Sequence, residues 1–447
     1  MMPATPWPAH REAAMEDALL SLLVLVGMLT LGAPLPFCFC GALMYMSIFA
    51  DVSMKGMLLW ATSQILSPVL LCVPLFIFAG SLMSASKIAQ HLLDFMDIFV
   101  GSVRGGLGLV ATVTCAVIGA ISGSGFTGVA AIGPILIPRM VEKGYPRGYA
   151  AALVTDSSIL GLLIPPSVIM IVYGWVTETS ILACFLATVL PGLLVTLSFS
   201  LINIIWARRF PLVLEPKLSM REKVGHFRTR GVKAIPALVM PVIILGGIYG
   251  GVVTPTEAAA VSVIYAIPVG FFVYRGMNLK QYFNIATQAS VSVGSIMLMI
   301  CCSLMLSQTY TMLRIPQTIV ESVFAVTQDS TLLLIAVNLV LVFVGMIVND
   351  ITGMILVAPL LLPLMVAIGI NPIHFGAIIG VNLAIGGVTP PYASILYLGM
   401  RVGKVEFSEI LGPAMLFALL GYLPVMLLTT FWPPLSLYLP GLMGYLN

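Results

Sequence analysis

Long apolar runs without a charged residue alternate with short polar segments along the whole chain. These runs cover residues 18–50, 56–86, 105–138, 157–177, 179–207, 234–256, 281–313 and 351–400. A helix needs about 20 consecutive apolar residues to cross the hydrocarbon core of a bilayer. The pattern therefore predicts an all-α polytopic membrane protein with roughly ten or more crossings.

Composition agrees with this pattern, because 60% of the residues are hydrophobic and 8% are charged, whereas soluble domains carry roughly 25% charged residues. The first apolar run is not expected to be a cleaved signal peptide, since no small-residue cleavage site follows it. Residues 1–16 read as an N-terminal extension, with Met15 as an alternative start, and residues 435–447 as a C-terminal tail. The seven cysteines lack metal-type spacing and are expected to pack as small apolar side chains.

A basic segment divides the chain. Eight of the 20 Lys and Arg residues lie between positions 208 and 233, where only Glu215 and Glu222 oppose them. Positive charge near the ends of spans marks the cytoplasmic side. Residues 208–233 are therefore predicted to form a cytoplasmic linker between a first repeat, 17–207, and a second repeat, 234–434. Spans flank this basic segment on both sides, so a nucleic-acid partner is not expected.

The two halves resemble each other in sequence. "GPILIPRMVEKGYP" (133–146) matches "APLLLPLMVAIGINP" (358–372), and "GLLIPPSVIMIVYG" (161–174) matches "GGVTPPYASILYLG" (386–399). The second pair keeps two adjacent prolines in register, and proline breaks a helix by removing a hydrogen-bond donor. Interrupted spans at corresponding positions of two halves are typical of secondary transporters, which bind their substrate there. The two halves are therefore predicted to be repeats of inverted topology.

Each half also predicts a re-entrant helical hairpin. The apolar run 105–138, bracketed by Arg104 and Arg139, is too long for one span and too short for two. Its middle, "SGSG" (122–125), is a poor helix former, and "NDITG" (349–353) interrupts the second half in the same way. Backbone at membrane depth must be buried in protein or line a cavity. The hairpin tips and Pro-Pro breaks are therefore expected to converge, with oxygen ligands suited to Na⁺ and helix N-termini suited to a carboxylate.

Two acidic residues, Asp156 and Asp350, are predicted to lie at membrane depth. A charge there costs roughly 2.5–3.5 kcal/mol, so a functional role is the default interpretation, with a structural ion pair as the alternative. The small residues of the hairpin tips have an alternative role in close helix packing.

Other polar residues favour structural roles. Thr254 and Glu257 in "TPTE" predict a capping box rather than a site. Arg401 is suited either to an anionic substrate or to snorkelling at the interface. The charged residues of segment 87–97, "KIAQHLLDFMD", suggest an amphipathic interfacial helix of the scaffold. His374 has no ligand-spaced partner.

Four motifs, in order, resemble the large membrane subunit of the tripartite ATP-independent periplasmic (TRAP) transporters. They are "ISGSGFTGVAAIGPILIPRMVEKGYPRGYAAAL", "LLIPPS", "GGVVTPTEAAAV" and "VNLAIGGVTPPY", and the resemblance covers residues 17–434. It implies a Na⁺-driven, elevator-type importer of small organic anions, such as C4-dicarboxylates, other carboxylates or sulfonates, in the bacterial inner membrane. It also implies a small four-helix membrane subunit and a periplasmic substrate-binding protein as partners, Na⁺ as coupling ion and no organic cofactor.

The resemblance also implies site residues. One Na⁺ site would use Ser122, Gly123, Ser124, Gly161 and Pro165, and a second Asn349, Asp350, Thr352, Gly386 and Thr389. Substrate would contact Gly125, Thr127, Asp156, Ser167, Tyr392 and Arg401. Asp156 departs from the family pattern, where a small or neutral residue is expected, and it aligns with Asn382 of the second half.

Three other functions remain open at this point. Two intramembrane aspartates also define diaspartyl proteases, but the surroundings "VTDSS" and "VNDIT" lack the glycine-rich setting of those enzymes. A passive channel does not need paired hairpins with polar tips. A Na⁺/dicarboxylate carrier that works without a binding protein would use the same hairpins and breaks.

Overall fold

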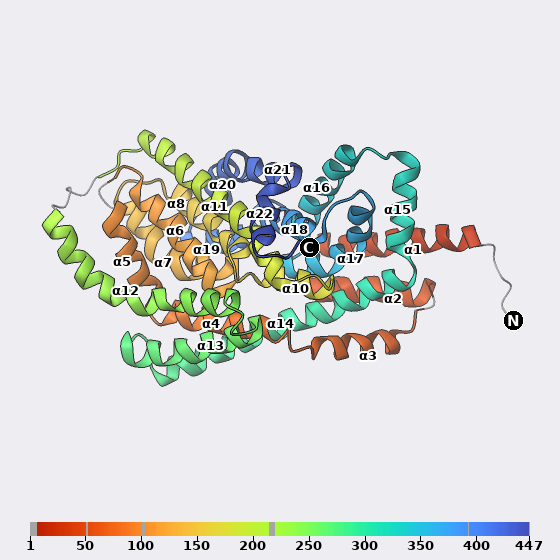
Figure 1. Cartoon of the computed structure of the whole chain (residues 1–447), viewed down its shortest axis with the longest axis horizontal. Helices are drawn as coiled ribbons and strands as arrows, with labels where there is room; N and C mark the ends of the chain where they lie inside the picture. Colours follow the sequence, from red (N-terminus) through yellow and green to blue (C-terminus); the bar gives the residue numbers. More distant parts are fainter. Residues whose placement is uncertain (1–6, 51, 101–102, 214–219, 392, 447) are drawn as a thin grey trace.

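The computed structural model describes residues 7–50, 52–100, 103–213, 220–391 and 393–446, and the regular secondary structure of this part of the chain is entirely helical. By length and composition, nine of these helices could cross a membrane. The number is up to ten if Cys72–Ala85 and Ile88–Ile98, bent by 67°, form one broken span. The polytopic prediction is thus supported, at the lower end of the expected number of crossings. The molecule is elongated (Figure 1).

The helices of the first half end at the start of the basic segment. They are α1 (Trp7–Thr30), α2 (Leu35–Phe49), α3 (Met54–Ile65), α4 (Cys72–Ala85), α5 (Ile88–Val100), α6 (Gly106–Ser122), α7 (Gly125–Glu142), α8 (Arg147–Ser158), α9 (Leu160–Leu163), α10 (Val168–Val176), α11 (Ile181–Trp206) and η1 (Ala207–Arg209). The break between α9 and α10 falls at the two adjacent prolines, as expected from their missing N–H groups.

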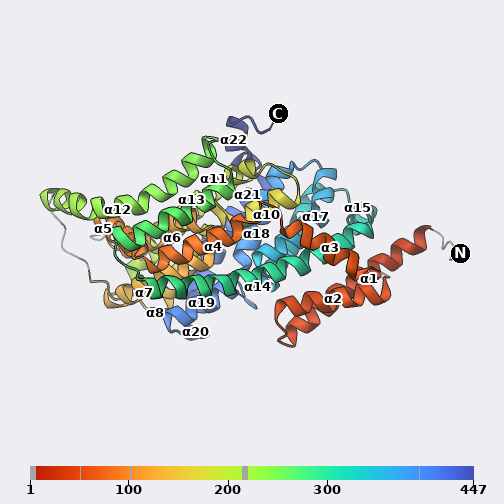
Figure 2. The same cartoon turned by 90° about the horizontal axis from the view of Figure 1, so that it is seen from below.

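The remaining helices belong to the second half. They are α12 (Met220–Tyr249), α13 (Pro255–Pro268), η2 (Val269–Val273), α14 (Leu279–Met312), α15 (Ile315–Val326), α16 (Ser330–Ile347), α17 (Asp350–Ala367), α18 (Pro372–Gly386), α19 (Ser394–Gly403), α20 (Phe407–Leu416), η3 (Phe417–Tyr422), α21 (Leu423–Phe431) and α22 (Pro434–Leu442). Helices α12, α13, α4 and α14 lie side by side (Figure 2).

Local capping explains where several of these helices begin. The predicted capping box is confirmed, since Thr254 Oγ1 accepts from the Glu257 N–H and the Glu257 carboxylate accepts from the Thr254 N–H at 2.7 Å. Asn278 forms a second capping box at the start of α14. Asp329 Oδ1 accepts from the Thr331 N–H at 2.8 Å at the start of α16. Each cap satisfies backbone N–H groups that have no partner within the helix.

Both ends of the hairpin α6–α7 lie beside the same short segment. Arg104, just before α6, donates from Nε to Ala207 O at 3.4 Å and from Nη2 to Phe210 O at 2.9 Å. Just after α7, Lys143 O accepts from the Val213 N–H at 3.0 Å. The hairpin therefore begins and ends on one side of the molecule, next to the start of the basic segment.

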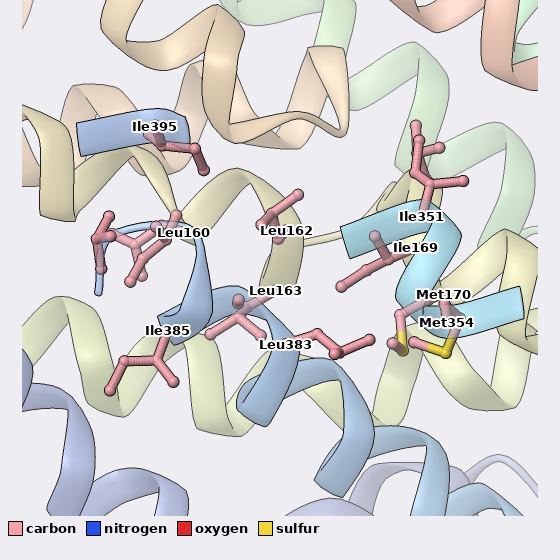
Figure 3. Packing of buried hydrophobic residues seen from close by; sticks show 14 of the residues in the cluster. Leu160, Leu162, Leu163, Ile169, Met170, Ile351, Met354, Leu383, Ile385 and Ile395 are labelled. Carbon is pink, nitrogen blue, oxygen red and sulfur yellow. The ribbon is translucent and has the colours of Figure 1, made fainter. Parts of the chain in front are cut away.

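The two halves interlock crosswise. Helix α19, which follows the second Pro-Pro break, packs against α7 of the first hairpin, and α10, which follows the first break, packs against α17 of the second. Figure 1 shows the same exchange, with α19 beside α7 and α10 beside α17. Apolar side chains from α9, α10, α17, α18 and α19, among them Leu163, Ile169, Met354 and Leu383, fill the junction between the halves (Figure 3). This buried junction holds the two hairpins and the two broken helices together.

Helices extend into the three segments that were predicted to lie outside the two repeats. Helix α1 begins at Trp7, so residues 7–16 of the predicted extension are helical. Helix α12 begins at Met220, so the second part of the predicted linker 208–233 belongs to a long helix. The first part of this helix was not predicted because it is charged, and a span is predicted from apolar periodicity.

The predicted C-terminal tail contains helix α22, which packs against α11. Ser436 of α22 and His374 of α18 form a hydrogen bond of 2.6 Å between Oγ and Nδ1. His374, for which the sequence offered no partner, is thus a buried structural residue that joins α18 to α22.

Candidate functional site

The first hairpin turns at Gly123 and Ser124. Helix α6 ends at Ser122, whose buried hydroxyl donates to Ile118 O at 3.1 Å. Gly123 follows with a φ of +62°, a conformation that glycine adopts without steric cost, and its N–H donates to Gly119 O at 2.8 Å. The tip is therefore shorter than the predicted 122–125, since Ser122 and Gly125 remain helical.

The first break is organised by two missing N–H groups. In a continuous helix, residue 166 would donate to Leu162 O and residue 165 to Gly161 O, but both are prolines. Ser167 replaces the first of these bonds, because its buried hydroxyl donates to Leu162 O at 2.5 Å. In the described part of the chain no hydrogen bond is made to Gly161 O. The break thus leaves a carbonyl oxygen available to a ligand.

The tip and the break of the first half are in direct contact. The Val168 N–H donates to Gly123 O at 3.3 Å. A Cβ atom on Gly123 would lie 2.8 Å from Pro166 O, and one on Gly161 would lie 2.9 Å from Ser124 O. The structure therefore brings Ser122, Gly123 and Ser124 of the predicted first Na⁺ site to the break that contains Gly161. The contact that the break makes with Gly123 comes from Pro166, whereas Pro165, the fifth predicted residue, has no such contact with the tip among the described residues.

We expect Ser167→Ala to destabilise the protein by about 1–3 kcal/mol, because it leaves the buried Leu162 carbonyl without a donor. Thermal unfolding of the purified protein measures this effect. Ser262→Ala is the matched control: the Ser262 hydroxyl is also buried and donates to Ala258 O at 2.7 Å, within the continuous helix α13. Ala258 O keeps its helical N–H partner there, so this loss should be smaller. Equal losses in the two variants would contradict the role given to Ser167.

The second hairpin turns at Val348 and Asn349. Asn349 caps α17, with its Oδ1 accepting from the Ile351 N–H at 3.1 Å, and Asp350 is the first residue of that helix. An acidic residue in the first turn is favoured by the helix dipole. Thr352 Oγ1 is buried without a hydrogen-bond partner among the described residues, and Ser303 of α14 donates to Thr352 O at 3.2 Å. The predicted tip 349–353 is thus shorter than expected, since the polar residues after Asn349 are helical.

The second break lies between α18 and α19. Thr389 donates from its hydroxyl to Ile385 O at 2.8 Å and from its N–H to Gly386 O at 3.2 Å. Gly387 O accepts from the Ile395 N–H at 3.0 Å. The carbonyls of this break therefore have more internal partners than Gly161 O has in the first. The Pro-Pro peptide bonds of both breaks are cis.

Matching glycine pairs join hairpin and broken helix in both halves. A Cβ on Gly119 of α6 would overlap the backbone of Gly161, and a Cβ on Gly386 of α18 would overlap the backbone of Gly345 in α16. Gly119 and Gly345 each lie four residues before their hairpin tip, at Gly123 and Asn349. Only glycine permits such backbone contact.

The predicted substrate residues do not share one environment. A Cβ atom on Gly125 would lie 2.9 Å from Cδ1 of Ile395 in α19. Thr127 instead lies against Gly80 of α4. Ser167 is engaged within the break, as described above. Arg401 is exposed in the last turn of α19, away from the break that precedes this helix. Tyr392 lies outside the described residues.

Asp156 on α8 is fully buried, and neither of its carboxylate oxygens has a hydrogen-bond partner in the described part of the chain. Tyr149 lies two turns earlier on the same helical face, where it packs against Phe417 and donates to Asn203. An ionised carboxylate buried without a partner costs several kcal/mol. Asp156 therefore requires either a proton or a bound cation.

Sequence reasoning missed a second set of polar residues beside the broken helices. Asn382 Nδ2 and Thr430 Oγ1 both donate to Asn338 Oδ1, at 2.8 and 2.9 Å, and Asn382 Oδ1 is left without a partner among the described residues. In the first half, Thr112 and Ser157 share a hydrogen bond of 3.1 Å. Single polar residues within apolar runs, such as Asn338, were the signal that could have found them.

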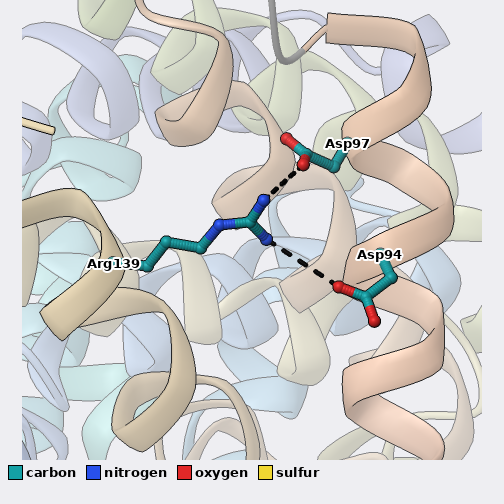
Figure 4. A network of polar contacts seen from close by, with 3 residues as sticks. All are labelled: Asp94, Asp97 and Arg139. Atoms are coloured by element: carbon teal, nitrogen blue, oxygen red, sulfur yellow. Dashed lines mark hydrogen bonds and ion pairs between the residues drawn. The ribbon is translucent and has the colours of Figure 1, made fainter. Parts of the chain in front are cut away.

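An ion pair ties the first hairpin to α5. Arg139 near the end of α7 forms a close ion pair with the buried Asp97 and lies 3.9 Å from the half-exposed Asp94 (Figure 4). Asp97 Oδ1 has no hydrogen-bond partner among the described residues. Residues 88–97 are helical as predicted, whereas Lys87 lies in the turn before α5, and Asp97 faces the hairpin rather than a polar surface.

Comparison with known proteins places the chain in a family. Residues 22–435 match the family described as "Tripartite ATP-independent periplasmic transporter, DctM component". The chain belongs to this family. The large permease protein DctM of a C4-dicarboxylate TRAP transporter from Pseudomonas aeruginosa is 36% identical over 84% of this chain and 87% of its own length.

A second relative is also named as a TRAP large permease protein. The ectoine/5-hydroxyectoine large permease protein UehC from Ruegeria pomeroyi is 31% identical over 94% of this chain and 98% of its own. The fold is similar to that of the YdaH transporter from Alcanivorax borkumensis, with a TM-score of 0.59, 14% identity and coverage of 86% and 91% of the two chains. The chain is thus a TRAP large permease of the bacterial inner membrane, not an enzyme, and the protease alternative is wrong.

Proposed function

We propose that this TRAP permease couples the entry of Na⁺ to the import of a small organic anion that a periplasmic binding protein delivers. One observation carries the proposal: a hairpin tip touches the Pro-Pro break of its own half and leaves the Gly161 carbonyl without a donor. Backbone carbonyls of unwound helices coordinate Na⁺ in transporters of this architecture. Ser122, Ser124 and Gly161 would supply such oxygens in the first half.

The second Na⁺ would bind at the tip of the second hairpin. Asn349 and Asp350 lie at the start of α17, and the buried hydroxyl of Thr352 has no other partner among the described residues. Side-chain oxygens would therefore contribute more here than in the first half, because Thr389 already occupies the carbonyls of Ile385 and Gly386. A carboxylate next to the ion would also offset its charge.

Inverted repeats and an elevator movement complete the mechanism. The first hairpin opens beside the basic segment, which is predicted to be cytoplasmic. The segment that leads into α14 lies beside the same basic segment, since Tyr274 donates to Lys233 O at 2.6 Å. Helix α14, from Leu279 to Met312, is long enough to cross a bilayer from there before the second hairpin begins. The second hairpin would therefore open to the other side. The crosswise packing of α7 with α19 and α10 with α17 would make both hairpins and both breaks move as one block.

The anion and the partners follow from the family and from the site. The half-helix N-termini of α7, α10 and α17 point toward the tips and breaks from which they begin, and such ends favour a carboxylate. The relative named for C4-dicarboxylate agrees with a carboxylate substrate. The small membrane subunit would complete the scaffold, and the lipid-facing helices would surround the moving block.

Uptake into proteoliposomes tests this proposal. The vesicles contain the chain and its small subunit, the binding protein is outside, and radiolabelled succinate heads a panel of carboxylates. We expect accumulation only with an inward Na⁺ gradient and the binding protein. Asp350→Asn should lower the rate at least about tenfold, the equivalent of about 1.4 kcal/mol of lost interaction. Asp329→Asn is the matched control, since this exposed residue only caps α16 and asparagine caps equally well.

Three other results of the uptake experiment would each indicate a different function. Accumulation without the binding protein would identify a carrier of the Na⁺/dicarboxylate type. Accumulation driven by a proton gradient and lost in Asp156→Asn would move the coupling to Asp156. Downhill equilibration without accumulation would identify a passive channel.

A further inference from the structure

A cavity of about 580 Å³ opens between α5, α12 and the end of η2. None of the tip or break residues lines it. Its polar lining consists of Lys87, Gln90, His91, Lys233 and Tyr274, and Val232, Pro236 and Val273 contribute apolar surface. Nothing in the transport mechanism uses this cavity.

The wall of the cavity is held by specific contacts. Tyr274 donates from its hydroxyl to Lys233 O at 2.6 Å, and the His91 ring stacks on the Tyr274 ring with 4.5 Å between centroids. Lys87 sits at the elbow between α4 and α5 with a φ of +63°, a left-handed backbone that only its surroundings can maintain. The two lysines therefore come from different elements, Lys87 from the turn before α5 and Lys233 from α12.

The cavity carries positive charge. Lys87 and Lys233 are exposed, and neither forms an ion pair with another described residue. Asp94, one turn beyond His91 on α5, is the nearby acid, but it faces Arg139 at 3.9 Å. The ammonium groups are thus available to an anion that enters from outside.

Two residues of the cavity lie near the ends of candidate spans. Lys233 is the last residue of the basic segment that is predicted to be cytoplasmic and lies near the start of the span Arg228–Tyr249, and Tyr274 follows the last residue of the span Pro255–Val273. Lysine stems can lie along apolar surface while their charges reach the headgroup region. Basic pockets between spans on this side fit the headgroups of anionic phospholipids.

We propose that this cavity binds the phosphate ester of an anionic phospholipid headgroup, with Lys87 and Lys233 contacting the phosphate and with His91 and Tyr274 forming the wall. The lipid would bridge α5 to α12. Because α5 is also tied to the first hairpin through Asp97 and Arg139, the lipid would fix the position of the element that leads into this hairpin. The proposal does not rest on the substrate or on Na⁺ coupling.

Native mass spectrometry of the delipidated full chain in neutral detergent tests the site. Dioleoyl phosphatidylglycerol is titrated against the parent and against Lys87→Gln/Lys233→Gln. We expect binding to weaken about thirtyfold in the double variant, on the order expected for two basic residues at a membrane surface. Lys280→Gln, an exposed lysine at the start of α14 outside the cavity, should bind like the parent. Lys87→Arg/Lys233→Arg should also retain the lipid.

Further arms distinguish the source of the phosphate. Phosphatidylcholine with the same acyl chains should bind more weakly than phosphatidylglycerol. Glycerol 3-phosphate or inorganic phosphate that displaces the lipid at millimolar concentration would identify a soluble phosphate as a ligand of the same site, and failure to displace it would identify the lipid. Equal binding of phosphatidylglycerol to the parent and the glutamine variant, or equal binding of the two lipids, would overturn the proposal. The unfolding midpoint of each variant verifies that it is folded.

Discussion

Replacing Gly386 or Gly161 with alanine is expected to lower the free energy of unfolding by about 1–3 kcal/mol and to stop transport. The added methyl group of Gly386→Ala would overlap the backbone of Gly345, and that of Gly161→Ala would lie 2.9 Å from Ser124 O. Backbone atoms cannot move aside as a flexible side chain can, so the hairpin must separate from its broken helix. Such a separation would dismantle the oxygen cluster proposed for Na⁺. Thermal unfolding and vesicle uptake measure the two losses.

Gly294→Ala provides the matched control. Gly294 lies inside α14, and a Cβ there would meet no atom within 4 Å. Alanine favours a helix over glycine by up to about 1 kcal/mol, so this variant should be as stable as the parent or more stable. If Gly386→Ala unfolded no earlier than Gly294→Ala, the backbone contact between α16 and α18 would not matter as described.

The second large effect concerns the ion pair between the first hairpin and α5. We expect Arg139→Met to destabilise the protein by about 3 kcal/mol, because it leaves the carboxylate of Asp97 buried without its partner. The Arg139→Met/Asp97→Leu double variant should recover most of this loss, since it removes both charges. Chemical or thermal unfolding of the single and double variants in the same detergent measures the difference.

Asp94→Ala separates the two carboxylates that face Arg139. Asp94 is 40% exposed and 3.9 Å from the guanidinium group, so its loss should cost less than about 1 kcal/mol. A double variant as unstable as Arg139→Met would refute the burial argument. A loss from Asp94→Ala as large as that from Arg139→Met would mean that Asp94 is the principal partner.

The positions of the hairpins and breaks could be predicted because local chemistry decides them. Pro165 and Pro166 lack the N–H groups that a continuous helix needs, and glycine at 123 accepts a left-handed backbone. The exact tips could not be predicted, because serine and asparagine serve equally as a last helical residue, a cap or a turn. Ser122 proved helical and Asn349 a cap, which shortened both tips relative to the predicted segments.

Long-range contacts were the part that sequence could not supply. Nothing in the local pattern indicates that Asp97 faces Arg139, that Asn338 joins Asn382 and Thr430, or that α19 packs on the hairpin of the other half. These contacts depend on how the helices cross, and a helical residue can meet any neighbour on its own face. Helix α22 was missed for a related reason, because its packing on α11 stabilises a short helix that its sequence alone would not predict.

The central claim, that the tips and breaks bind Na⁺, is tested most directly by unfolding in Na⁺ against K⁺. The purified chain and Asp350→Asn are heated while NaCl replaces KCl at constant ionic strength. A ligand that binds only the folded state at a hundred times its Kd stabilises it by about 2.7 kcal/mol. We predict a rise in the unfolding midpoint that is specific to Na⁺ and smaller in Asp350→Asn. Identical curves in Na⁺ and K⁺ would contradict the account.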